Sequence, residues 1–158
     1  MISISVQAED FDVGSEYRQL LNDDSGVGGV AMFTGLVRDI TGNPLVHMLL
    51  EHYPGMTEAS LQQTAEQAAG RWPLNDIRIV HRIGELAPGD QIVFVGVSSA
   101  HRDAAFSACE FIMDVLKTTA PFWKKEIHRD GSGHWVDAKN SDQQRAERWS
   151  ERRSRKDT

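Results

Sequence analysis

Two lysines on either side of a proline are the residues of this chain best suited to chemistry. Lys117 lies in the apolar run FIMDVLKTTA, which predicts a helix, and Lys124 follows Pro121, Phe122 and Trp123. Proline disfavours helix in the residue before it, so we expect a basic, aromatic segment to follow the helix. The two amines can then reach one ligand from different elements. On spacing alone, two solvated lysines are the simpler interpretation, because a lysine in a last helical turn gains about 0.3–1 kcal/mol from the helix dipole.

A second candidate lies in VFVGVSSAHR, where a predicted strand leads into a helix that starts near His101 and Arg102. Free backbone N–H groups at a helix start favour an anion, and a guanidinium matches phosphate or carboxylate. A solvated first turn is an equally good interpretation of these two residues. Arg38, in TGLVRD near the end of another predicted strand, is weaker evidence when taken alone.

Composition limits the class of protein. The chain has 158 residues, a net charge of −6 and one cysteine, Cys109. This length predicts one domain, which we place at residues 1–149, followed by a charged tail at 150–158. One cysteine excludes an internal disulfide and a cysteine-based metal cluster. The histidines have no metal-ligand spacing, so no metal site is expected.

Charge is distributed unevenly. Residues 1–60 hold nine acidic and two basic side chains, whereas residues 101–158 hold ten and twelve. Basic charge therefore gathers around the candidate site, which suits a local anionic ligand. Because the chain as a whole is acidic and has no recognition motif, we do not expect a nucleic-acid partner. Because we find neither a signal peptide nor a long apolar run, we expect a cytoplasmic protein that does not contact membranes.

Strand and helix patterns are mixed without strict alternation, which predicts an α+β fold with a mostly antiparallel sheet and packed helices. Strands are expected at 2–7, 76–84 and 91–99, with a long hairpin at 28–53 around a turn at 41–44 and a second hairpin at 124–138. Helices are expected at 12–21, 57–70, 101–118 and 141–156, with Asp12, Thr57 and Ser98 or Ser99 as caps of the first three. The buried face of the third helix is expected to include Phe106 and Cys109.

Several segments resemble one family, the catalytic (large) subunit of molybdopterin synthase, over about residues 3–149. The segments are LEHYPGMTE at 50–58, RWPL at 71–74, HRIGEL at 81–86, PGDQIVFVGVSSAHR at 88–102, FIMDVLKTTAPFWKKE at 111–126 and SDQQRAERW at 141–149. The AHR segment together with LKTTAPFWKKE is highly specific. The resemblance implies a hammerhead-type α/β fold.

The resemblance also implies roles for particular residues. The resemblance implies that Lys117 is the catalytic residue and that Lys124 assists it. The substrate-binding residues that it implies are Arg38, His101, Arg102, Lys125 and Glu126. One position departs from the family pattern, since members often have lysine where this chain has Leu36, which puts a direct role for position 36 in doubt.

The family implies sulfur transfer to cyclic pyranopterin monophosphate (precursor Z), which forms the molybdopterin dithiolene in molybdenum cofactor biosynthesis. The implied sulfur donor is the thiocarboxylate at the Gly-Gly C-terminus of a small ubiquitin-like subunit, and no cofactor is implied. Two alternatives stay open. One is a transferase or cyclase that acts on a phosphate ligand without a sulfur donor. The other is a non-catalytic binding module for a ubiquitin-like partner.

The spacing of Arg102 and Lys117 predicts an assembly. Fifteen residues of helix separate them, which is about 22 Å at 1.5 Å per residue. If both contact one small substrate, as the resemblance implies, they come from different chains. We therefore expect a symmetric homodimer at the centre of a heterotetramer, in which His101 and Arg102 of one protomer face Lys117 and Lys124 of the other.

Overall fold

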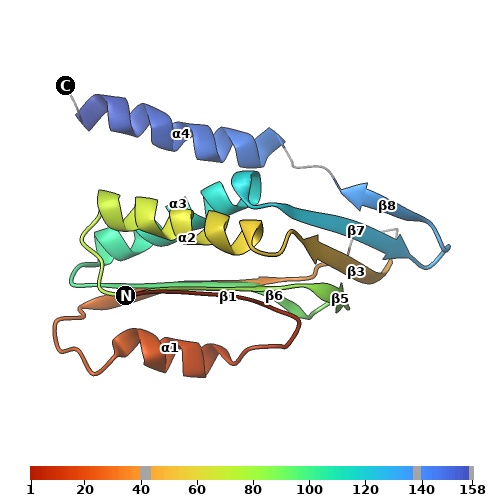
Figure 1. The fold of residues 1–158 in the computed structure, drawn as a ribbon, viewed down its shortest axis with the longest axis horizontal. Helices are drawn as coiled ribbons and strands as arrows, with labels where there is room; N and C mark the ends of the chain where they lie inside the picture. The colour runs from red at the N-terminus through yellow and green to blue at the C-terminus, as the bar shows by residue number, and fades with distance from the viewer. Residues whose placement is uncertain (40–43, 137–139, 157–158) are drawn as a thin grey trace.

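The computed structural model describes residues 1–39, 44–136 and 140–156. Within these residues the chain forms eight strands and four helices (Figure 1). In chain order they are β1 (Ile2–Gln7), α1 (Val13–Leu21), β2 (Gly29–Leu36), β3 (Leu45–His52), α2 (Met56–Arg71), β4 (Ile77–Arg82), β5 (Gly84–Leu86), β6 (Gln91–Ser99), α3 (Arg102–Thr119), β7 (Phe122–His128), β8 (Gly133–Val136) and α4 (Asn140–Lys156).

The strands form two sheets. Sheet 1 has the order β1-β4-β6-β2, and sheet 2 has the order β5-β3-β7-β8. Only the β1–β4 pair is parallel among the strand pairs of the described residues. In Figure 1, α1 covers one face of sheet 1, α2 and α3 cover the other, and α4 lies outside these two helices. The predicted α+β fold with a mostly antiparallel sheet is therefore confirmed.

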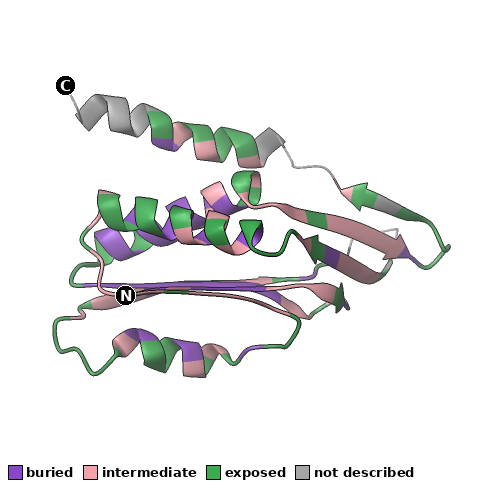
Figure 2. Cartoon of the chain, viewed as in Figure 1, coloured by how far each residue is buried: buried purple, intermediate pink, exposed green. Residues whose placement is uncertain are grey.

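The sequence of β6 shows why sheet 1 forms the centre of the core. QIVFVGVSS is apolar almost without alternation, and every residue from Ile92 to Ser99 is buried. Such continuous burial requires cover on both faces, which α1 and α3 supply. Figure 2 shows the buried residues concentrated along the strands of sheet 1 and on the helix faces turned toward it. A rigid sheet 1 is thus available to position side chains at its ends.

Most of the predicted elements are present, and the caps differ in detail. The side chain of Asp12 accepts a hydrogen bond from Ser15 N at 2.7 Å, as predicted for the start of α1. The predictions for α2 and α3 were wrong, because the N-cap residues there are Gly55 and His101. Thr57 instead lies inside α2, where its hydroxyl accepts from Tyr53 N and donates to the carbonyl of Pro121.

The predicted hairpin at 28–53 was wrong. β2 pairs with β6, and β3 pairs with β5 and β7, so the two halves of the expected hairpin belong to different sheets. Turn residues between two strand-forming runs predict local pairing, but burial against distant strands decided the partners instead. Residues 41–43 of the predicted turn, and residues 137 and 138 of the second hairpin, lie outside the described residues.

Two further differences concern helices. Phe106, expected on the buried face of α3, is 66% exposed, because the buried stripe of this helix runs through Ala105, Cys109 and Ile112. The predicted tail at 150–158 is helical as far as the structure describes it, since α4 continues to Lys156. Residues 157 and 158 lie outside the described residues.

Candidate active site

The position of Lys117 is decided by how α3 follows β6. β6 runs from Gln91 to Ser99, and α3 then returns along it, with the Cys109 thiol 3.8 Å from the Val95 carbonyl. The last turn of α3, which holds Lys117, therefore lies at the end of sheet 1 where β6 begins. β4 ends on this side as well, since His81 pairs with Val93.

Strand β7 brings the second lysine to the same end. Lys124 lies opposite Leu50 of β3, which is 1% exposed, so its side chain is on the face of sheet 2 that joins the core. Phe122 and Glu126 share that face, because side chains alternate along a strand. Glu126 lies 3.3 Å from the buried His128, two residues further on.

His81 is the buried group on which the charges of both lysines act. Its side chain is 3% exposed, and its ring stacks on that of Phe122 with centroids 3.7 Å apart and planes 18° from parallel. Its Nδ1 is 2.8 Å from the carbonyl oxygen of Arg82. Burial is the main cause that lowers the pKa of His81 to about 3; the charges of Lys124, Lys117 and His52 lower it as well, against the opposing effect of the Arg82 carbonyl. Two cations from α3 and β7 thus act on one neutral imidazole.

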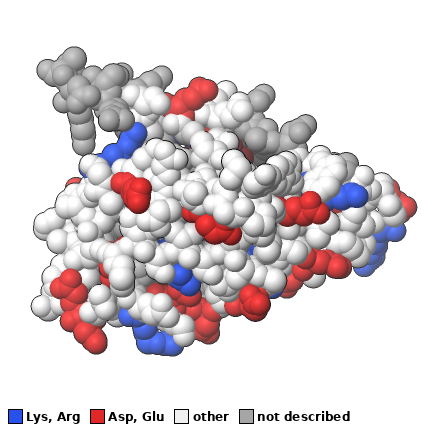
Figure 3. Space-filling view, in the orientation of Figure 1, with Lys and Arg blue, Asp and Glu red and all other residues white. Residues whose placement is uncertain are grey.

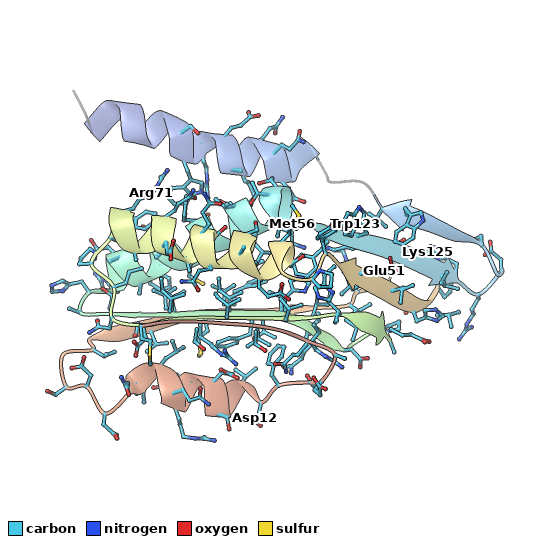
Figure 4. The ribbon with its side chains drawn as sticks, viewed as in Figure 1. Asp12, Glu51, Met56, Arg71, Trp123 and Lys125 are labelled. Carbon is cyan, nitrogen blue, oxygen red and sulfur yellow. The ribbon has the colours of Figure 1, made fainter. Side chains whose placement is uncertain are left out.

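Lys125 is separated from this group. It lies opposite Leu49, on the other face of sheet 2 from Lys124, and its ammonium is 5.7 Å from the centre of the Trp135 ring. On that outer face a shallow hollow of about 430 Å³ is lined by Glu51, Trp123 and Trp135. Figure 4 shows Trp123 and Lys125 along β7, with Glu51 on the neighbouring strand β3. The hollow therefore lies on the other face of sheet 2 from Lys124.

His101 and Arg102 lie at the opposite end of α3 from Lys117. Both side chains are exposed, and eighteen residues of continuous helix run from Arg102 to Thr119. Within one chain they are not brought to the lysines. Arg38 is also exposed and lies two residues beyond β2, whose last residue Leu36 pairs with Gln91. Arg38 is therefore at the same end of sheet 1 as Lys117.

On the face shown in Figure 3, charged side chains do not form a single large patch. In the view of Figure 3, acidic side chains are scattered over the face, and basic side chains occur in small separate groups. In the described ranges 1–39, 44–136 and 140–156, no group of three or more His, Cys, Asp or Glu side chains could hold a metal ion. No helix in those same ranges is both long and apolar enough to cross a membrane.

Sequence reasoning missed the central residue of the site. His81 was considered there only with the other histidines, which lack metal-ligand spacing, and nothing in its position along the chain connects it with Lys117 or Lys124. Its segment HRIGEL was among those carrying the family resemblance, and that was the available signal.

Comparison with known proteins decides the family. The model of the MoaE protein family matches residues 6–119, which is more than half of the chain. The chain belongs to the MoaE family. It is 56% identical over 147 residues to the molybdopterin synthase catalytic subunit of Vibrio cholerae, covering 92% of this chain and 97% of that one. The catalytic subunit of Escherichia coli K12 is 53% identical over 147 residues, with the same coverage.

Solved structures agree with this assignment. A molybdopterin biosynthesis MoaE protein from Burkholderia ambifaria superposes with a TM-score of 0.82 at 48% identity, covering 95% of this chain and 99% of that one. The family membership, the enzyme class and the fold class predicted from the sequence are therefore confirmed.

Proposed function

We propose that this MoaE chain transfers sulfur to cyclic pyranopterin monophosphate from the C-terminal thiocarboxylate of a small ubiquitin-like subunit, in molybdenum cofactor biosynthesis. Lys117 and Lys124 form its acid/base pair. The observation that carries this proposal is that Lys117 on α3 and Lys124 on β7 are both near enough to the buried ring of His81 for their charges to lower its pKa. A cytoplasmic location, predicted from the sequence, belongs to the same proposal.

The groups at this site match the chemical requirements of the reaction. Carbon–sulfur bond formation needs proton transfer and stabilisation of developing negative charge, and ammonium groups held at a sheet end supply both. Arg38 lies at the same end of sheet 1 and is free to bind the substrate phosphate with its guanidinium. The chain contributes these groups itself.

His101 and Arg102 complete the site from a second copy of the chain. They lie about 22 Å along α3 from Lys117, and one small substrate does not span that length. β2 is an edge strand of sheet 1, and it exposes Met32 by 42% and Phe33 by 44%. Phe106, near the start of α3, is 66% exposed. Unpaired strand edges and exposed apolar side chains favour association, so we place a symmetric dimer contact on this side.

The sulfur donor is a separate chain. The relatives are called catalytic subunits, a name that implies an assembly with at least one further chain. A glycine-ended tail is narrow enough to reach the lysine pair beside β7, where backbone pairing and contact with its terminal carboxyl group give recognition. The proposed assembly is a heterotetramer with a central homodimer.

Reconstitution tests this function. The purified chain is mixed with precursor Z and a small subunit that carries either a thiocarboxylate or an ordinary carboxylate, and dithiolene product is measured. We expect product only with the thiocarboxylate. Product formation without any small subunit would favour a phosphate-ligand transferase or cyclase instead, and partner binding without turnover would favour a binding module.

A further inference from the structure

The backbone of His81 lies between two neighbouring strands of sheet 1. On one side it pairs with Val6 of β1, and on the other with Val93 of β6. Its side chain is 3% exposed. Because neighbouring strands hold the residue on both sides, the position of its ring is decided by the core rather than by a loop.

The tautomer of the ring follows from its hydrogen bond. Nδ1 lies 2.8 Å from the carbonyl oxygen of Arg82. A carbonyl oxygen only accepts, so Nδ1 carries the proton and donates it. In a neutral imidazole the other nitrogen, Nε2, then holds a lone pair and acts as an acceptor.

The groups around this ring come from three other elements. Lys117 on α3, Lys124 on β7 and His52 on β3 all act on it electrostatically, and His52 itself lies 3.6 Å from Glu58 on α2. Burial, together with these charges, keeps the pKa of His81 at about 3, so the ring is neutral at neutral pH. A neutral acceptor beside two ammonium groups attracts them, whereas an imidazolium would repel them.

We propose that His81 is a positioning residue for the lysine pair, and that its Nε2 accepts a hydrogen bond from one of the two ammonium groups. The inference rests on the proposed sulfur transfer by Lys117 and Lys124. The stack of His81 on Phe122 supports it, since Phe122 lies two residues before Lys124 on the same face of β7. The ring of His81 contacts the start of β7 at Phe122, and its Nε2 lone pair accepts from an ammonium group. The histidine therefore holds these two parts of the site together.

Two substitutions separate this role from a structural one. Both His81→Asn and His81→Gln remove the aromatic stack. His81→Asn keeps a donor near the place of Nδ1 but has no acceptor at the place of Nε2, whereas His81→Gln puts an amide oxygen close to that place. His47→Gln is the matched control, because His47 is a partly exposed histidine paired with Glu85.

We expect His81→Asn to lower the kcat of sulfur transfer about tenfold, as befits one lost hydrogen bond to a charged group. His81→Gln is expected to recover most of this loss, and His47→Gln to match the wild type. Loss of the acceptor disfavours the charged ammonium, so the lysine-controlled limb of the pH–kcat profile moves to lower pH in His81→Asn only. The inference would be overturned if kcat fell equally in both His81 variants and in proportion to the decrease in their melting temperatures.

A measurement on the unmodified chain keeps the inference testable if a variant does not fold. Nitrogen-15 NMR of the imidazole is expected to show a protonated Nδ1, and an unprotonated Nε2 that accepts a hydrogen bond, with no titration from pH 5 to 9. An Nε2–H tautomer or titration near pH 6.5 would refute it. Because this readout needs no substrate, it tests His81 separately from sulfur transfer, whose failure would appear as absent product with the wild-type chain.

Discussion

The ring of His81 in β4 lies 3.7 Å from the ring of Phe122 in β7, and the two planes are 18° from parallel. The contact joins sheet 1 to sheet 2, which have separate strand pairing. Lys117 extends from a helix packed on sheet 1, and Lys124 belongs to sheet 2. The stack therefore helps to set the distance between the two lysines.

Lys117→Ala is expected to lower product formation by roughly 10²-fold or more, the usual effect of losing a general acid or base. Lys117 is exposed, so its loss leaves the core and the melting temperature unchanged. Single-turnover product formation with the thiocarboxylated small subunit measures the effect. Lys125→Ala is the matched comparison, and since Lys125 lies on the other face of sheet 2, its loss should be much smaller. Near-normal turnover by Lys117→Ala would remove the lysine from the mechanism.

Arg102→Ala and Lys117→Ala chains should complement each other when mixed. In a symmetric dimer with shared pockets, one pocket of the mixed dimer carries both changes and the other carries neither. Random mixing makes half of the dimers mixed, so about a quarter of wild-type activity should return. Activity is measured after the two chains are unfolded and refolded together, with each variant refolded alone as the control. No recovery in dimers shown to be mixed would exclude the shared pocket.

The stability of the chain should fall as the solution is acidified, partly through His81. The pKa of this buried ring is about 3 in the folded chain, against an ordinary value of 6.5. The unfolded chain therefore binds the extra proton first, so stability is complete above pH 6.5 and is lost as pH falls toward 3. Between pH 7 and pH 4 this accounts for on the order of 3 kcal/mol. Urea unfolding of the wild type and of His81→Gln at pH 7 and pH 4 measures this loss of stability. If the two proteins showed the same pH dependence of stability, His81 would not be responsible.

Trp149→Ala should lower the free energy of unfolding by about 3–5 kcal/mol, the range for a buried aromatic truncated to alanine. Trp149 is 3% exposed and packs edge-on against Trp72 and Phe111. Its Nε1 donates to the carboxylate of Asp114 at 2.8 Å.

Trp135→Ala is the control for that experiment, because Trp135 is 51% exposed and its loss leaves little cavity. Chemical denaturation of both variants against the wild type gives the two values. Equal effects would mean that α4 is not held by Trp149.

Removing the last two residues of the small subunit should abolish sulfur transfer and weaken its association with this chain. The reason is that the proposed tail contact lies at the lysine pair, and the two terminal residues carry the sulfur-bearing group. Calorimetric titration measures the affinity, and product formation measures the transfer. Full affinity for the shortened subunit would place the main contact on the globular part of the partner instead.

The sequence alone determined the local features of this protein. The alternation of ISISVQ predicts β1, and Asp12 predicts the start of α1, because period and capping depend on neighbouring residues. The family could also be predicted, since the AHR and LKTTAPFWKKE segments are specific as strings of residues. The two lysines were identified from their position around Pro121 and from these segments. The rise of a helix then showed that Arg102 and Lys117 lie too far apart on one helix for one small substrate.

Only the tertiary structure decided which distant residues meet. β2 and β3 look like one hairpin along the chain, yet they separate into two sheets because β6 and β7 provide partners that bury them better. The same long-range pairing turns Lys124 toward the core and Lys125 away from it. It also places His81 beside both lysines, although 36 residues of chain separate it from Lys117. Contacts of this kind depend on packing between elements, which the pattern of a single segment does not contain.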